Sequence, residues 1–139
     1  MATKYIIFIT MLLAISISIM PDIYRLEIAL PGTTFPLIHN HPGDYFSYIS
    51  YMKSGEQGKW KVTSRVNSDR FEPQFAYTIF ILLGKIGKIT NIELPWIYFA
   101  ARIVFGWFLL YICFLSVCFL FKKSIYRVVG CILIFFSTG

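Results

Sequence analysis

The residues of this sequence that could carry out chemistry gather between positions 21 and 72, and Asp44 stands out among them. Asp44 follows Pro42-Gly43, a pair that breaks the preceding structure, and it opens an aromatic segment, DYFSYISYMK. A carboxylate in this place can act as an N-cap by accepting a hydrogen bond from the helix backbone, and it can act as a general base. The two roles are compatible, because a capped helix start holds the carboxylate in one position.

Two histidines precede this carboxylate. His39, His41 and Asp44 have a spacing that resembles a set of metal ligands. Pro42 and Gly43 make the spacing irregular, however, and two histidines two residues apart are common by chance. The simpler interpretation is a solvated turn, so the sequence predicts no metal site at these residues.

Two further charged residues lie beside or within predicted apolar helices. Glu72 comes directly before Pro73 at the start of one helix, where an acidic side chain complements the helix dipole. Arg102 lies about two turns into another helix, and an arginine is costly in lipid unless it reaches protein, water or an anionic group. Arg102 therefore either extends to a nearby interface or binds a phosphate head group, which its planar fork of donors suits.

The composition of the whole chain is that of a membrane protein. Of 139 residues, 57% are hydrophobic and only 14% are charged, against about 25% charged in soluble domains. The mean hydropathy is +0.65. A net charge of +6 does not indicate nucleic acid, because the basic residues are scattered or flank apolar spans, as topology signals do. The three cysteines lie in apolar runs, so we expect neither a disulfide framework nor zinc.

Apolar helices must position these residues, and the sequence contains four apolar spans. The first follows Lys4 and is interpreted as a retained anchor rather than a cleaved signal peptide, since Ala14 and Ser16 offer only a poor cleavage site. The last span has about a dozen residues and falls short of the ~30 Å bilayer core, so we expect an incomplete final helix of a longer chain. The predicted spans cover residues 4–20, 73–92, 94–121 and 128–139.

A long extramembrane loop, residues 21–72, separates the first two spans. Within it, Tyr45, Tyr48, Ile49 and Met52 recur at helical spacing and form one apolar-aromatic face. A short helix with such a face is expected to lie in the membrane interface. The predicted fold is therefore all-α and polytopic, with all 139 residues forming the N-terminal part of one membrane domain that contacts lipid.

Three stretches, in this order, resemble the start of a GT-C-type glycosyltransferase, a polytopic membrane enzyme that uses polyprenyl-phosphate sugars. The first is an acidic residue with an aromatic helix and G-x-W, DYFSYISYMKSGEQGKW. The second has a proline before a helix and an LLG turn, FEPQFAYTIFILLGKIG, and the third has an arginine that opens a helix, LPWIYFAARIVF. The resemblance runs from about Asp44 to Phe121. It departs from the pattern in the connection 122–127, which carries no acidic residue.

The resemblance implies a lipid-linked sugar donor and an acidic residue at the sugar acceptor. Asp44 would be that residue, as a general base or as a ligand to a divalent metal. Arg102 would approach the donor phosphate, and Tyr48 and Glu72 would contact substrate. Missing C-terminal helices of the same chain would complete the enzyme. The alternative is a small non-enzymatic membrane subunit or assembly factor whose aromatic loop binds a partner, which the composition does not exclude.

The charge distribution and the resemblance together predict an orientation in a bacterial cytoplasmic membrane. The N-terminal amine and Lys4 outweigh the charges just after the first span, which favours an N-terminus inside and a loop outside. Against this stand the basic residues of the loop and three more after the third span, Lys122, Lys123 and Arg127, which four spans would place outside. Because the resemblance also implies it, we expect the N-terminus inside.

Overall fold

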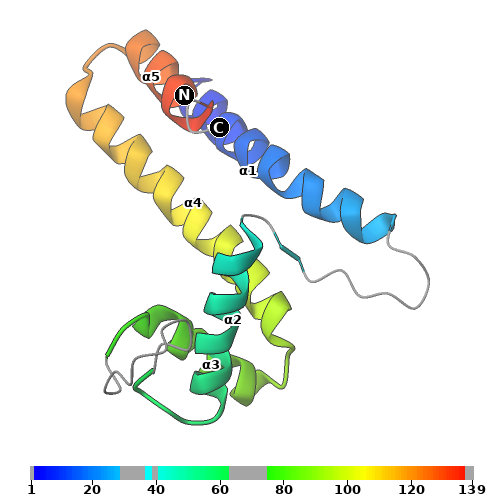
Figure 1. The fold of residues 1–139 in the computed structure, drawn as a ribbon. Coiled ribbons are helices and arrows are strands. Elements are labelled where there is room, and N and C mark those ends of the chain that lie inside the picture. Colours follow the sequence, from blue (N-terminus) through cyan, green and yellow to red (C-terminus); the bar gives the residue numbers. More distant parts are fainter. Residues whose placement is uncertain (1, 29–36, 39–40, 63–74, 137–139) are drawn as a thin grey trace. The chain divides into compact units, whose positions relative to one another are not determined.

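The computed structural model describes residues 2–28, 37–38, 41–62 and 75–136, and the regular elements in these residues are helices. The predicted all-α class is confirmed (Figure 1). In chain order the helices are α1 (Ala2–Glu27), α2 (Pro42–Glu56), α3 (Thr78–Thr90), α4 (Leu94–Leu120) and α5 (Ser124–Phe136).

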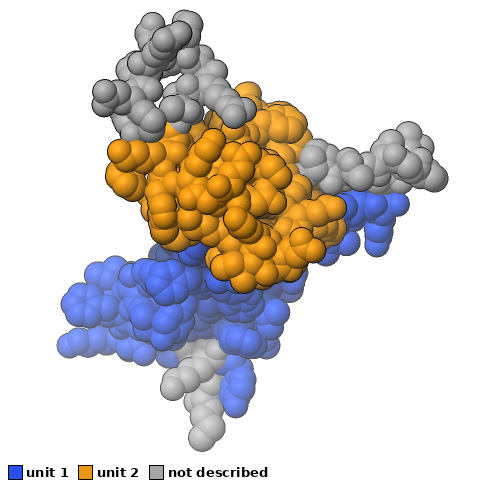
Figure 2. Space-filling model, turned by 90° about the horizontal axis from the view of Figure 1, so that it is seen from below, with its two compact units in different colours: residues 1–28, 102–139 blue, residues 29–101 orange. Residues whose placement is uncertain are grey.

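The chain divides into two compact units, coloured separately in Figure 2. Unit 1 combines residues 1–28 with residues 102–139, and unit 2 comprises residues 29–101. Helix α4 contributes its first residues to unit 2 and the rest to unit 1. Each unit has an apolar core of its own, so each can hold its own side chains in place.

Two helices, α1 and α4, are long and apolar enough to cross a membrane. Helix α4 has 27 residues, about 40 Å, and its bounds agree to within one residue with those predicted, 94–121. Helix α1 is longer than predicted, because it continues through Pro21 to Glu27 instead of ending at Met20. A proline removes one backbone hydrogen bond, which long apolar helices tolerate. This extension places Asp22 inside the helix.

The core of unit 1 brings α1, α4 and α5 together. Its buried residues are Ile7 and Met11 of α1, Val117 of α4, and Cys131 and Phe135 of α5. Because Ile7 and Met11 lie in the first half of α1 and Val117 lies near the end of α4, these two helices run antiparallel. Helix α5 lies beside α1 (Figure 1). It begins four residues before the predicted start of the fourth span, 128–139.

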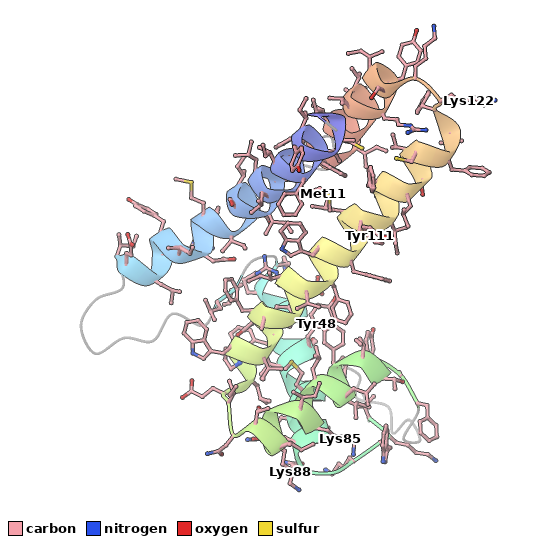
Figure 3. All side chains as sticks on the ribbon, turned by 180° about the vertical axis from the view of Figure 1, so that it is seen from behind. Met11, Tyr48, Lys85, Lys88, Tyr111 and Lys122 are labelled. Carbon is pink, nitrogen blue, oxygen red and sulfur yellow. The ribbon has the colours of Figure 1, made fainter. Side chains whose placement is uncertain are left out.

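Unit 1 also contains an apolar crevice between α1 and α4. Its volume is about 760 Å³. One wall is formed by Ile7, Phe8 and Met11 of α1, and the other includes Trp107, Tyr111 and Phe114 of α4. Met11 and Tyr111 are labelled in Figure 3. The crevice shows that α1 and α4 do not fill the space between them over this length.

Unit 2 is built on a close contact between α2 and α3. A Cβ atom at Gly55 of α2 would collide with the backbone carbonyl of Ile81, and one at Gly84 of α3 would collide with that of Met52. The two helices therefore approach backbone to backbone, which only glycine at both contact points allows. We call this contact the glycine seam, Gly55 and Gly84.

The predicted second span, 73–92, is a much shorter helix in the described residues. Helix α3 begins at Thr78 and ends at Thr90, and its 13 residues extend only about 20 Å. The backbone conformation of single residues sets both ends of α3. Tyr77 before the helix and Asn91 after it adopt the left-handed conformation, with φ of 53° and 56°. Asparagine is a common residue at such a helix end. A 20 Å helix is too short to cross a ~30 Å core.

The apolar face predicted for residues 45–52 exists but faces protein. Tyr45 is 3% exposed and Met52 is 0% exposed. Met52 packs in the unit 2 core with Leu83 of α3 and with Leu94 and Ile97 of α4. The expectation that this face contacts the membrane interface is therefore wrong, because neighbouring helices already cover it.

Candidate functional site

Helix α2 positions the candidate acid Asp44, although not in the way the sequence suggests. The helix begins at Pro42, and its N-cap is His41, whose Nδ1 accepts a hydrogen bond from the backbone N–H of Gly43 at 3.3 Å. The predicted N-cap role of Asp44 is therefore wrong. Proline is favoured at the first helical position, because it has no N–H to leave unpaired there, and this moves the helix start ahead of Asp44.

Asp44 lies in the first turn of α2, and its side chain is exposed. A negative charge in a first turn is stabilised by the partial positive charge of the helix N-terminus. The next residue, Tyr45, is buried and anchors this turn to the rest of unit 2. The carboxylate is thus accessible to a ligand from solvent while its backbone is held in place.

Tyr48, the predicted substrate contact, belongs to an aromatic cluster inside unit 2. Its ring stacks on Phe80 of α3 with a centroid distance of 4.4 Å and an interplanar angle of 6°. Tyr98 of α4 lies 6.4 Å from Tyr48, and Tyr45 meets Tyr98 edge to face at 5.5 Å. Tyr48 is labelled in Figure 3. Its ring therefore packs α2 against α3 and α4 in this structure.

The same cluster extends toward the start of α3. Tyr51 stacks on Tyr77 with their centroids 4.4 Å apart. Burial raises the pKa of Tyr51 above its ordinary 10.0, and Tyr77 and Tyr48 raise it further. Burial likewise raises the pKa of Tyr45, with a second contribution from Tyr98. The phenols of Tyr45 and Tyr51 therefore stay neutral to a higher pH than free tyrosine.

Arg102 forms an ion pair that the sequence did not predict. Its Nη1 lies 3.2 Å from Oδ2 of Asp22, within unit 1. The side chain of Asp22 is fully buried and that of Arg102 is 21% exposed. Removing a charged group from water is costly unless it pairs with an opposite charge. The attraction between Arg102 and Asp22 therefore offsets part of the desolvation cost of both side chains. The sequence features that could have indicated this pair are an acid two residues past the first predicted span and an arginine inside the third.

The predicted site residues fall into separate parts of the chain. Asp44 and Tyr48 belong to unit 2, and Arg102 belongs to unit 1. Glu72 and His39 lie outside the described residues. Within the part of the chain that the structure describes, no three His, Cys, Asp or Glu side chains come together as a metal site would require.

The comparisons with known proteins add no relative. No protein-family model, no curated protein and no solved structure matches this chain. A functional interpretation therefore depends on the residues and on the geometry described above.

Proposed function

We propose that this chain is a membrane-inserted part of a GT-C-type glycosyltransferase in a bacterial cytoplasmic membrane. In this proposal α1 and α4 cross the bilayer, and unit 2 lies on the outer side, where it meets the sugar acceptor. The length and apolar character of α1 and α4 support the membrane part. Their antiparallel packing in unit 1 supports it too, because two consecutive crossings of a bilayer must run in opposite directions.

The distribution of basic residues supports an N-terminus inside. If α3 does not cross, the chain crosses the bilayer twice between Lys4 and Lys122, and an even number of crossings returns it to the starting side. Lys4, Lys122, Lys123 and Arg127 then all lie inside, as the positive-inside rule prefers. Figure 3 shows Lys122 at the end of α4. This removes the conflict at Lys122, Lys123 and Arg127, while the basic residues of the long loop still lie outside.

The proposed reaction uses Asp44 as a general base. Its carboxylate takes the proton from an acceptor hydroxyl as the hydroxyl oxygen attacks the anomeric carbon of the donor sugar. The bond from that carbon to the phosphate oxygen breaks, and polyprenyl phosphate leaves with the electron pair. Arg102, in unit 1, is proposed separately as a contact of a phosphate group, since a guanidinium that bonds Asp22 through Nη1 has further N–H donors.

The observation that carries this proposal is the accessible carboxylate of Asp44 on the anchored first turn of α2. Its test is Asp44→Asn in the complete reading frame, assayed in membranes by release of polyprenyl phosphate from polyprenyl-phosphate-linked hexoses. A general base contributes about 10²–10⁴-fold, so we expect a decrease of that size. Because His41 is the N-cap, the helix start should survive the change.

Glu93→Gln is the matched control for this experiment. Glu93 is also an exposed acid of unit 2, and it directly precedes α4. Its replacement removes the same charge and should leave transfer within a few-fold of the parent chain. Equal transfer by the Asp44→Asn and Glu93→Gln variants, at matched expression, would remove Asp44 from the reaction.

A second candidate function is a non-enzymatic membrane subunit, and the crevice in unit 1 favours it. A crevice of about 760 Å³ with apolar walls on α1 and α4 can receive a transmembrane helix of another protein. A photo-crosslinking residue at Phe108, which lines the crevice and is 61% exposed, tests this candidate. A crosslink to one defined protein, together with unchanged sugar transfer in the Asp44→Asn variant, would favour the subunit over the transferase.

A further inference from the structure

The outer face of α3 carries an apolar stripe that no described residue covers. Ile79, Leu82, Ile86 and Ile89 follow one another at intervals of three or four residues, which places them on one side of a helix. Their exposed fractions are 44%, 41%, 45% and 84%. The opposite side of α3 carries Gly84 of the glycine seam. We call these four residues the α3 stripe.

The outer face of α2 has the opposite character. Ser47, Ser50, Lys53, Ser54 and Gln57 occupy the side of α2 that points away from the buried Tyr45, Met52 and Gly55, at about 100° per residue. Four of them, with Phe46 and Ile49, line a groove of about 370 Å³. The α2–α3 pair therefore has one polar outer face and one apolar outer face, with the glycine seam between them.

Lysines and a tryptophan border the α3 stripe. Lys85 follows Leu82 by three residues and precedes Ile89 by four, so it lies at the edge of the stripe, whereas Lys88 follows Gly84 by four residues and lies on the other side of α3. Both lysines are labelled in Figure 3. The Lys85 Nζ lies 4.1 Å from the centroid of the Trp60 ring and donates a hydrogen bond to the carbonyl of Gly58 at 3.4 Å. This contact brings Lys59 and Lys61, which flank the half-exposed Trp60, to the same region.

We propose that the α3 stripe lies in the interfacial layer of a membrane, with the lysine border against anionic lipid head groups. A helix that inserts an apolar face about 5–10 Å deep and carries basic residues beside it is a membrane-surface helix. Lysine favours phosphate head groups and tryptophan favours the interface level. Helix α3 thus lies on the membrane without crossing it, and unit 2 uses α3, rather than α2, for lipid contact.

The connection to α4 supports a lipid surface as the partner of the stripe. Only residues 91–93 separate α3 from α4, and three residues span at most about 11 Å. Residues 94–101 of α4 belong to unit 2 and add only about 12 Å of helix. If α4 enters the bilayer just beyond them, the chain itself keeps the end of α3 close to the bilayer surface. This inference rests on the proposed membrane insertion of α4, and it does not depend on catalysis by Asp44.

Single cysteines that carry an environment-sensitive fluorophore test the proposal in the full chain. Cys113, Cys118 and Cys131 are replaced by alanine, and circular dichroism verifies that the helices persist. Labels are placed at Ile86 and Ile89 in the stripe, at Gln57 on the polar face of α2, and at Leu109 of α4, which is 60% exposed. The protein is reconstituted in phosphatidylcholine vesicles with phosphatidylglycerol, and quenching by doxyl-labelled lipid and by aqueous iodide is compared.

We expect doxyl-labelled lipid to quench the fluorophores at positions 86, 89 and 109, and iodide to quench the fluorophore at position 57. Iodide quenching at Ile86 and Ile89 would overturn it, and so would protection from both quenchers, which would mean that protein covers the stripe. The Leu109 label separates the two proposals: if it is quenched by lipid while the stripe is not, the membrane insertion stands and the stripe proposal falls. If iodide quenches Leu109, membrane insertion itself fails.

The lysine border has its own readout in the same vesicles. Lys85→Gln removes the charge at the edge of the stripe, and a basic residue near an anionic membrane surface is attracted to it. We expect doxyl quenching at Ile89 to fall in this variant, and to fall also for the parent chain when phosphatidylglycerol is omitted. Quenching that is indifferent to both changes would overturn the assignment to anionic head groups.

Discussion

Arg102 and Asp22 place two opposite charges within the described residues of unit 1, one of them fully buried. The sequence showed that Arg102 needed a partner, because an arginine in an apolar span seldom lacks one. It did not show that Asp22 was the partner, because Asp22 followed the apparent end of the first span. Only the continuation of α1 through Pro21 brings this carboxylate into the helix. Partners that come from distant segments depend on tertiary packing, which residue spacing does not report.

A double-mutant cycle on this pair should show strong coupling. Removal of one partner of a buried pair leaves an uncompensated charge and typically costs about 3–5 kcal/mol. Asp22→Leu should therefore destabilise unit 1 more than the double change Asp22→Leu with Arg102→Leu, which leaves no charge. The measurement is the midpoint of unfolding in mixed detergent micelles. Additive losses in the double variant would show that the pair contributes nothing to the packing of unit 1.

Asp44 illustrates how much of the candidate site the sequence could predict. Its aromatic surroundings and its place at a helix start were predicted from composition and spacing, and both are found. The cap itself was assigned to the wrong residue, because Pro42 fits the first helical position and His41 supplies an acceptor nitrogen. Its catalytic role stays a prediction, as do the substrate contacts of Arg102, Tyr48 and Glu72.

At the scale of elements, the helices were predicted best where one physical factor dominates. Helix α4 contains a long apolar run, ended by Lys122 and Lys123, so hydropathy alone sets its limits. Helix α3 was predicted too long because its apolar run continues past the left-handed residues Tyr77 and Asn91 that end it. Hydropathy also does not show whether an apolar side chain is surrounded by lipid or by protein. For this reason the apolar face of α2 was assigned to the membrane.

The glycine seam makes a sharp prediction about α2 and α3. Gly84→Ala places a methyl group against the carbonyl of Met52, so the two backbones must separate. Overpacking typically costs about 1–3 kcal/mol, which corresponds to about 5- to 150-fold faster amide hydrogen exchange in α2 and α3 if these amides exchange by opening of unit 2. Exchange followed by mass spectrometry measures this effect.

Gly106→Ala is the matched control for the seam. Gly106 also lies in a helix, α4, but a Cβ atom there meets nothing within 4 Å among the described residues. Alanine is the better helix former, so exchange in unit 2 should not accelerate. Equal exchange rates in the Gly84→Ala and Gly106→Ala variants would show that α2 and α3 do not depend on the backbone contact.

At the scale of the whole molecule, the central proposal is that the chain crosses a membrane by α1 and α4 while α3 does not cross. The composition predicted a membrane protein, and two helices meet the length and hydropathy that a crossing requires. The number of crossings could not be derived from hydropathy, because a 13-residue helix with apolar neighbours resembles part of a longer span. The number of crossings before Lys122 determines which side each charged segment occupies.

Cysteine accessibility at Gln57 and Ser124 in intact cells tests this claim most directly. Both side chains are exposed. Gln57 lies before α3 in the chain, and Ser124 lies after α4. In a chain without its native cysteines, we expect a membrane-impermeant maleimide to label Gln57→Cys in intact cells and Ser124→Cys only after permeabilisation. Labelling of both positions in intact cells would place an additional crossing between them, at α3, and would contradict the account.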